Sequence, residues 1–230
     1  MSLEFCDLKR LFAIRERMTS LMSDAPSQAL LLSSLPRQPF SRLGVLCGSF
    51  NPPTLAHIEL ATRAAEEFRL DKVLFTIAKV TVDKEEVTGM TVEDRLMLLL
   101  CCCREYLSLG VSIVNRGLYF EQVQAFRSSI GRKVKNNELF FIIGMDKLIQ
   151  ILDPRYYVDR TAALGQLFEN STLVVANRGD LDKRQFDAVL NQPANRIYRR
   201  SVRFLALPAT VNKVSSTDVR RDWSEEAELI

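Results

Sequence analysis

The sequence predicts an α/β protein in which a doubly wound parallel sheet carries helices on both faces. Short apolar segments typical of buried strands alternate with segments of helical periodicity over most of the chain, and this alternation indicates strand–helix–strand units. Small or phosphate-suited residues follow four of the five predicted strands inspected for ligand contacts. Ligands of such sheets bind beyond the carboxyl ends of the strands, so we expect a binding site there.

Composition narrows the class of protein. The chain has 230 residues, 47% of them hydrophobic and 26% charged, and a formal net charge of +3. This length predicts one domain plus an extension, and the charge is too small to indicate nucleic-acid binding. No apolar segment approaches 18 residues, so we expect no membrane span. The N-terminus mixes charged and apolar residues and does not resemble a secretory signal.

Five cysteines are present, three of them consecutive at 101–103. Consecutive side chains of a helix point in different directions, so this triplet is a poor disulfide or metal site. We expect buried, reduced thiols and therefore a cytoplasmic compartment.

The N-terminal part is predicted to differ from the rest of the chain. Residues 3–22 have helix-like spacing, and the Ser- and Pro-containing residues 23–41 are typical of a linker or loosely packed arm. We therefore assign residues 1–40 to an N-terminal helical extension and linker, and residues 41–230 to the main domain.

Strands and helices then alternate along the main domain. Short runs rich in Val, Ile, Leu and Phe predict strands at 42–48, 72–80, 111–117, 138–144, 171–179 and 202–207. Apolar residues spaced three or four apart predict helices at 55–68, 92–107, 119–130, 182–192 and 216–229.

The stretch "GSFNPPTLAH", residues 48–57, follows the first of these strands. Gly48 and Ser49 let the backbone approach a ligand closely. Thr54 is expected to be the N-cap of the next helix, and His57, the only histidine, lies one turn into that helix. The N–H groups and the positive end of the helix suit an anion, most simply a polyphosphate. A plain strand-to-helix turn with a packed histidine is the alternative.

A second phosphate-binding segment is predicted in "VSSTDVRR" near the C-terminus. Ser215, Ser216 and Thr217 can cap a helix and present its N–H groups, and Arg220 lies three residues after Thr217. Hydroxyls, backbone amides and a guanidinium together suit a phosphate. Helix capping alone is the alternative.

Four segments resemble the nucleotidylyltransferase superfamily and, within it, the nicotinamide/nicotinate mononucleotide adenylyltransferases. "GSFNPPTLAH" is similar to the family's Gly-Ser/Thr-Phe-Asn/Asp-Pro-x-His/Thr-x-x-His. "FFIIGMDKL", "VVANRG" and "VSSTDVR" resemble its Ile-Gly-x-Asp, Val-x-x-Arg-x-Gly and Ile-Ser-Ser-Thr-x-Ile/Val-Arg segments. The four occur in family order over residues 43–220. The resemblance implies a Rossmann-like nucleotidylyltransferase fold.

The resemblance also implies a reaction, in which the mononucleotide phosphate attacks the α-phosphorus of ATP and gives a dinucleotide and pyrophosphate. Such chemistry needs alignment and charge neutralisation more than a protein nucleophile. Mg²⁺ carried by the ATP phosphates is the implied cofactor, and no protein metal site is expected. The implied catalytic residues are His57, Arg220 and Lys84. The implied ATP-binding residues are Gly48, Thr54, His57, Gly144, Asp146, Ser215, Ser216, Thr217 and Arg220, and the implied acceptor-binding residues are Ser49, Phe50, Arg178 and Tyr156.

Several of these residues have a simpler interpretation. Asp146 could cap a helix, and Arg178 could be a solvated turn residue. Lys84 lacks the proline-bearing pattern that precedes the family lysine. Arg95 fits a family arginine, but a helix-surface position or a buried ion pair fits it equally. Tyr156 or Tyr157 would replace a tryptophan that many relatives use to stack on the pyridine ring.

Two other functions stay open. One is a transferase of the same superfamily with another phosphorylated acceptor, such as phosphopantetheine, or a polyol phosphate with CTP. The other is a nucleotide-binding protein that hydrolyses ATP or only senses nucleotides. The expected partners are ATP and a pyridine mononucleotide, with no nucleic acid and no membrane. The sequence leaves open a homo-oligomer and the choice between nicotinate and nicotinamide forms.

Overall fold

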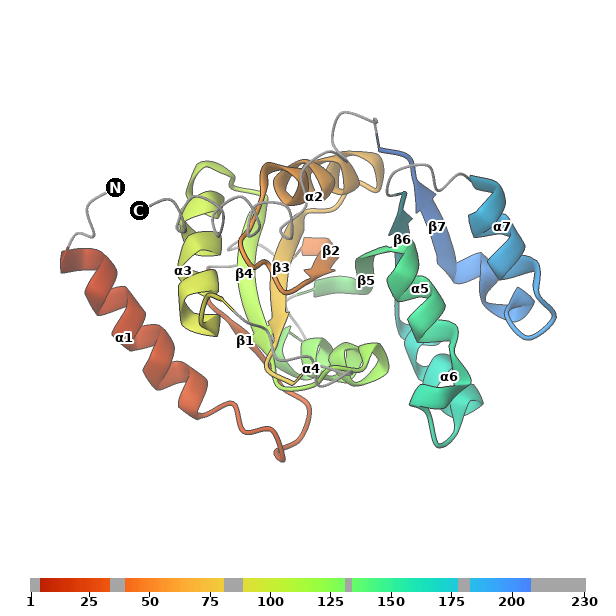
Figure 1. Cartoon of the computed structure of the whole chain (residues 1–230), viewed down its shortest axis with the longest axis horizontal. Helices are drawn as coiled ribbons and strands as arrows, with labels where there is room; N and C mark the ends of the chain where they lie inside the picture. The colour runs from red at the N-terminus through yellow and green to blue at the C-terminus, as the bar shows by residue number, and fades with distance from the viewer. Residues whose placement is uncertain (1–4, 34–39, 81–88, 131–133, 178–182, 208–230) are drawn as a thin grey trace, which may run out of the picture.

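The computed structural model of the chain describes residues 5–33, 40–80, 89–130, 134–177 and 183–207 (Figure 1). These residues build a seven-stranded sheet with the spatial order β1-β4-β3-β2-β5-β6-β7. The strands are β1 (Ala29–Leu31), β2 (Phe40–Cys47), β3 (Lys72–Ala78), β4 (Leu109–Val114), β5 (Val134–Gly144), β6 (Thr172–Ala176) and β7 (Val202–Leu205).

The sheet is parallel except at β1, which runs antiparallel to β4. At its centre Val45 of β2 pairs with Leu74 of β3 on one side and with Phe141 of β5 on the other. The chain therefore builds outward from β2 through β3 and β4, and then returns to the other side of β2 for β5, β6 and β7. This reversal creates a switch point between β2 and β5, where doubly wound sheets bind ligands.

Helices cover both faces of the sheet, which explains why its strands are almost continuously apolar. α1, α2 and α3 pack on one face around Phe75, and α4 to α7 pack on the other around Phe141. The helices are α1 (Phe5–Thr19), α2 (Leu55–Glu67), α3 (Val92–Cys102), α4 (Tyr119–Ile130), α5 (Met145–Leu152), α6 (Arg160–Asn170) and α7 (Lys183–Asn191), with short 3₁₀ helices η1 (Cys103–Glu105), η3 (Pro154–Tyr156) and η4 (Arg196–Ser201).

The predicted doubly wound α/β fold is confirmed, with all six predicted strands present. The helices expected within 55–68, 92–107, 119–130 and 182–192 are also present as α2, α3, α4 and α7. Helices α5 and α6 and strand β1 were not predicted from the sequence. The helix expected at 216–229 lies outside the described residues.

The N-terminal segment packs on the rest of the fold. α1 confirms the helix expected in residues 3–22 and lies beside α3 (Figure 1). Its Ile14 and Met18, with the following Leu21, are buried in the same core as α2 and α3. The linker expected at 23–41 is wrong at residues 29–31, which extend the sheet as β1, and at residues 40–41, which begin β2. Independent folding of residues 1–40 and 41–230 stays a prediction.

Asn115, directly after β4, forms hydrogen bonds with the turn between α1 and β1. Its fully buried side chain donates from Nδ2 to the carbonyl oxygens of Met22 (2.8 Å) and Pro26 (3.0 Å), and its Oδ1 accepts the Gln28 N–H (2.8 Å). Arg116 adds hydrogen bonds to the carbonyl oxygens of Ser23 and Ala25. Because buried polar groups need partners, these contacts tie the segment to the edge of the sheet.

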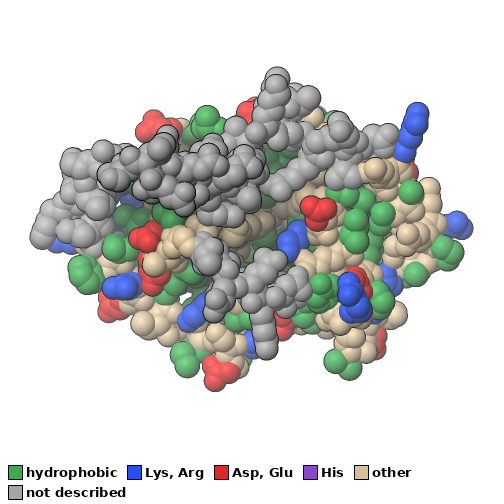
Figure 2. Space-filling model, in the orientation of Figure 1, with side chains coloured by type: hydrophobic (Ala, Val, Ile, Leu, Met, Phe, Trp, Pro, Cys, Tyr) green, Lys and Arg blue, Asp and Glu red, His purple; other side chains and the backbone are tan. Residues whose placement is uncertain are grey.

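Surface charges of both signs are interspersed over the described part of the face shown in Figure 2, in keeping with the small net charge. The described helices include none with the length and apolar character needed to cross a membrane. Cys47, Cys101, Cys102 and Cys103 are free thiols. The expectation of buried thiols holds for Cys103 but is wrong for Cys102, which is exposed, because consecutive helical positions face different environments.

Candidate active site

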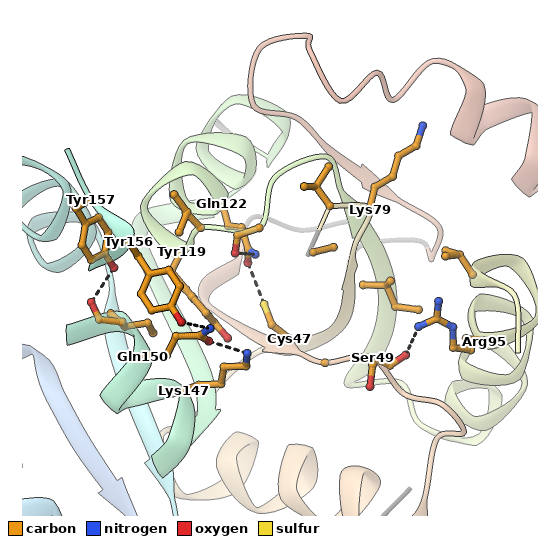
Figure 3. A pocket seen from close by; sticks show the side chains of 18 residues that line it. Cys47, Ser49, Lys79, Arg95, Tyr119, Gln122, Lys147, Gln150, Tyr156 and Tyr157 are labelled. Atoms are coloured by element: carbon orange, nitrogen blue, oxygen red, sulfur yellow. Dashed lines mark hydrogen bonds between the residues drawn. The ribbon is translucent and has the colours of Figure 1, made fainter. Parts of the chain in front are cut away.

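A cavity of about 490 Å³ opens at the switch point, beyond the carboxyl ends of β2 and β3 (Figure 3). Its volume lies within the range of about 300–1,000 Å³ that is usual for small-molecule sites. Helices α3, α4 and α5 and the 3₁₀ helix η3 supply the remaining walls. The lining residues are Cys47, Gly48, Ser49, Ile77, Ala78, Lys79, Val80, Val92, Arg95, Gly117, Leu118, Tyr119, Gln122, Lys147, Gln150, Ile151, Tyr156 and Tyr157.

The turn after β2 is shaped by Phe50, whose side chain is buried at 1% exposure. Its backbone has φ +47°, in the left-handed region that non-glycine residues seldom occupy. A Cβ on residue 48 would lie 2.9 Å from the Phe50 ring, so Gly48 is needed there for packing as well as for ligand approach. The ring meets Phe75 and His57 edge to face, with centroids 5.4 Å and 5.1 Å away.

Thr54 and His57 form the start of α2. Thr54 is the N-cap, as predicted. Its backbone N–H donates to His57 Nδ1 over 3.1 Å, and its Oγ1 lies 2.7 Å from the same nitrogen. We assign Nδ1 as the acceptor from this N–H, and the neutral ring then carries its proton on Nε2. The histidine is thus a side-chain donor fixed at the positive end of a helix.

Arg95, in the first turns of α3, holds the other side of the turn in place. Its side chain is 5% exposed, and it donates to Ser49 O over 2.8 Å and to Thr91 O over 3.2 Å (Figure 3). Burial lowers the pKa of Arg95. A buried ion pair was one expectation for Arg95. Within the described residues its side chain instead donates to carbonyl oxygens and lines the cavity.

The floor of the cavity is a buried, uncharged cluster of Cys47, Tyr119 and Gln122. Cys47 Sγ donates to Gln122 Oε1 over 3.0 Å, and the Tyr119 hydroxyl bonds the same sulfur. Burial raises the pKa of Cys47 to about 12 and that of Tyr119 well above its usual value. Both groups are therefore neutral near pH 7.

The charged lining of the cavity is entirely basic among the described residues. Lys79, Arg95 and Lys147 line it, and the lining includes no aspartate or glutamate. Lys147 Nζ donates to Gln150 Oε1 over 2.7 Å, and Gln150 Nε2 in turn lies 3.4 Å from the Tyr156 hydroxyl oxygen. Such a cavity favours anionic ligands.

The structure brings part of the predicted site together. Gly48, Ser49 and Tyr156, three of the predicted site residues, line the cavity, as does Arg95. Phe50 was expected to line the acceptor side, but its buried side chain instead packs edge to face against the His57 ring.

Of the predicted ATP-binding residues that the structure describes, Gly48 lines the cavity, and the other four lie at two helix starts. Thr54 and His57 begin α2. Gly144 is the N-cap of α5, and the exposed Asp146 lies in its first turn, so Asp146 is not the cap. A Cβ added to Gly144 would meet no atom within 4 Å, which leaves space at this helix start. Lys84, Arg178, Ser215, Ser216, Thr217 and Arg220 lie outside the described residues.

The contributions of the segment after β4 and of Lys147 and Gln150 on α5 were not predicted from the sequence. Gly117, Tyr119 and Gln122 line the cavity, and so do Lys147 and Gln150. The "NRG" that ends the strand at 111–117 was the available signal, because this strand also points its carboxyl end to the site. The Ile-Gly-x-Asp pattern does not specify the residue at position 147. Lys147 reaches the cavity because it lies in the first turn of α5.

The chain is similar in sequence to a known family and to several of its members. A family model described as cytidylyltransferase-like matches residues 45–222. The probable nicotinate-nucleotide adenylyltransferase of Clostridium beijerinckii is 28% identical over 193 residues, which cover 82% of this chain and 90% of the relative. The protein of the same name from Shewanella woodyi is 26% identical over 193 residues, covering 80% and 88%.

Among solved structures, the Plasmodium falciparum nicotinic acid mononucleotide adenylyltransferase complexed with NaAD is similar to this chain with a TM-score of 0.54. The match covers 79% of this chain and 83% of that chain at 13% sequence identity. At this identity the likeness supports a shared fold.

Proposed function

Since the chain belongs to the cytidylyltransferase-like family, we propose that it is an adenylyltransferase that joins ATP to nicotinate or nicotinamide mononucleotide, releasing pyrophosphate. The four motif resemblances agree with curated relatives named nicotinate-nucleotide adenylyltransferases. The observation that carries the proposal is the pairing of two features on one turn. Residues 48–49 line a cavity whose charged side chains, among the described residues, are all basic, and residues 54–57 start a helix with a fixed imidazole donor.

The two features suit the two substrates. The cavity would hold the mononucleotide. Its ring would lie near Tyr156 and near the backbone of Ser49, which Arg95 holds in place through a hydrogen bond. The start of α2 would hold ATP phosphates, since its N–H groups and His57 donate toward an anion. An oxygen of the mononucleotide phosphate would then attack the α-phosphorus, and the bond to the leaving pyrophosphate would break.

The chain's task in this reaction is alignment and charge stabilisation. His57 would donate to the phosphate oxygens as negative charge redistributes, and pre-placed donors of this kind reduce barriers because they need no reorganisation. The neutral floor of Cys47 and Tyr119 offers no thiolate nucleophile near pH 7, since burial raises the pKa of this thiol to about 12. Direct transfer between the substrates fits these residues.

Mg²⁺ carried by ATP is part of the proposal. The described residues contain no group of three or more His, Cys, Asp or Glu side chains able to hold a metal ion, so the phosphates would be its main ligands. The ion would neutralise phosphate charge. Roles for Ser215, Ser216, Thr217 and Arg220 at the distal phosphates, for Lys84 at the phosphates, and for Asp146 at the ATP ribose are proposed from the motif resemblance.

A panel of substrates tests the function. The purified chain is incubated with Mg²⁺, with ATP or CTP, and with nicotinate mononucleotide, nicotinamide mononucleotide, phosphopantetheine or glycerol phosphate. Chromatography then measures each condensed product. The proposal expects a dinucleotide from ATP and a pyridine mononucleotide. Product from another acceptor would favour a different transferase of the family, and ATP hydrolysis without a condensed product would favour an ATPase.

A cytoplasmic location belongs to the proposal too, because the four described cysteines are free thiols, as a reducing compartment would keep them.

A further inference from the structure

One end of the cavity combines an aromatic wall, an uncharged floor and a single ammonium group. Tyr156 and Tyr157 form the wall, and the cluster of Cys47, Tyr119 and Gln122 forms the floor (Figure 3). Lys147, from α5, lies at the rim. Flat aromatic side chains suit a flat aromatic ring, so this end fits the pyridine of the proposed acceptor.

The floor has little capacity to bind a charged substituent. The Gln122 amide group donates to the carbonyl oxygens of Arg116 (3.2 Å) and Gly117 (3.0 Å), and its Oε1 accepts from Cys47. Its donors are therefore already used within the protein. Because the thiol and the phenol are neutral, the floor supplies no charge opposite a carboxylate.

Lys147 supplies that charge. Its Nζ donates to Gln150 Oε1 over 2.7 Å, an uncharged partner, and none of the salt bridges among the described residues involves it. The positive charge of Lys147 is close enough to Cys47 to lower the pKa of that thiol. Burial of the thiol has the larger, opposite effect, so its pKa is raised overall. An ammonium has three donors, and Gln150 takes one of them.

The other two basic residues of the cavity bond elsewhere. Lys79 Nζ donates to Leu21 O over 2.8 Å, and Arg95 donates to Ser49 O and Thr91 O. Both lie on the opposite side of the cavity from Tyr156 and Tyr157 (Figure 3). Lys147 is thus the described basic residue on the aromatic side.

We propose that Lys147 selects the acceptor by binding the carboxylate of nicotinate mononucleotide, so that this form is preferred over nicotinamide mononucleotide. The inference rests on the proposed function. A carboxylate would accept a charge-assisted hydrogen bond from Nζ. The only acceptor that a carboxamide offers to Nζ is an uncharged oxygen, and the charged bond is about twice as strong.

The test compares the two mononucleotides in three variants. Lys147→Gln removes the charge while keeping a polar side chain, Lys147→Arg keeps the charge, and Lys79→Gln removes a charge from the opposite side of the same cavity. Both kcat/KM and the calorimetric Kd are measured for each mononucleotide, so binding gives a result even without turnover.

The wild type should prefer nicotinate mononucleotide by about tenfold or more. This factor is near the lower end of the affinity gain that a charge-assisted hydrogen bond gives, because Lys147 is exposed to solvent. Lys147→Gln should lose about tenfold with nicotinate mononucleotide and about twofold or less with the nicotinamide form. Lys147→Arg should keep the preference. Lys79→Gln should leave the ratio between the two unchanged.

Two results would overturn the inference. Equal losses for both mononucleotides in Lys147→Gln would mean that the residue binds their shared phosphate or supports the fold, and an unchanged ratio without loss would mean that it binds neither. Failure of the proposed function is distinct, since the wild type would then form no dinucleotide. If both mononucleotides also failed to bind, the inference would fall with it.

Discussion

Replacing Asn115 by alanine tests how much its hydrogen bonds to the N-terminal segment stabilise the fold. The fully buried amide makes three hydrogen bonds of 2.8–3.0 Å, to Met22 O, Pro26 O and Gln28 N. Each is worth about 1 kcal/mol net, and more where a buried partner is left without water. Asn115→Ala should therefore lower the free energy of unfolding by about 3 kcal/mol. That is a large part of the roughly 5–15 kcal/mol typical of a domain.

Urea denaturation followed by circular dichroism measures this change. Gln124→Ala serves as the control, because Gln124 is an exposed residue of α4 whose amide bonds only Gln166 in the described structure, and surface changes of this kind stay within about 0.5 kcal/mol. A loss below about 1 kcal/mol in Asn115→Ala would refute the reasoning. The hydrogen bonds of Asn115 would then contribute little to folding, and core packing of Ile14, Met18 and Leu21 would be what holds the N-terminal segment.

Three further predictions concern the site. His57→Ala should lower kcat by a factor on the order of 10² or more while the far-ultraviolet spectrum stays folded, and near-normal turnover would remove His57 from the reaction. Arg220→Ala should weaken ATP binding about tenfold to a hundredfold and AMP binding much less; calorimetric titration would contradict this if ATP affinity stayed within about twofold. At pH 8 iodoacetamide should label the exposed Cys102 at least about tenfold faster than Cys47, because burial raises the pKa of Cys47 to about 12 and disfavours its thiolate. The labelling rate of Cys47 should rise as the pH approaches about 12. Tandem mass spectrometry measures both rates, and equal rates at pH 8 would disprove the buried floor.

The parts of the fold that the sequence predicts well are those fixed by local pattern. The strands of the parallel sheet are almost continuously apolar because both faces are covered, and Thr54 precedes α2 with the chemistry of an N-cap. β1 could not be found this way. It has three residues, and its place in the sheet depends on pairing with β4, far along the chain.

The candidate site also has a part that local sequence predicts and a part that depends on long-range packing. Motifs marked the turn at residues 48–57 because its chemistry is contiguous in sequence. The floor was missed because Cys47 and Gln122 meet only when α4 packs against the end of β2. Phe50 was misplaced for a related reason, since a residue within a binding motif can point inward, and its left-handed backbone turns it into the core.

The central claim is transfer of the adenylyl group to a pyridine mononucleotide, and ATP carrying a radiolabel on its α-phosphorus tests it most directly. The chain is incubated with this ATP, Mg²⁺ and nicotinate mononucleotide, and the labelled products are separated by chromatography. We predict that the label moves into the dinucleotide and that one unlabelled pyrophosphate forms for each dinucleotide. Label that remains in ATP, or that appears only in AMP or ADP, would contradict the claim.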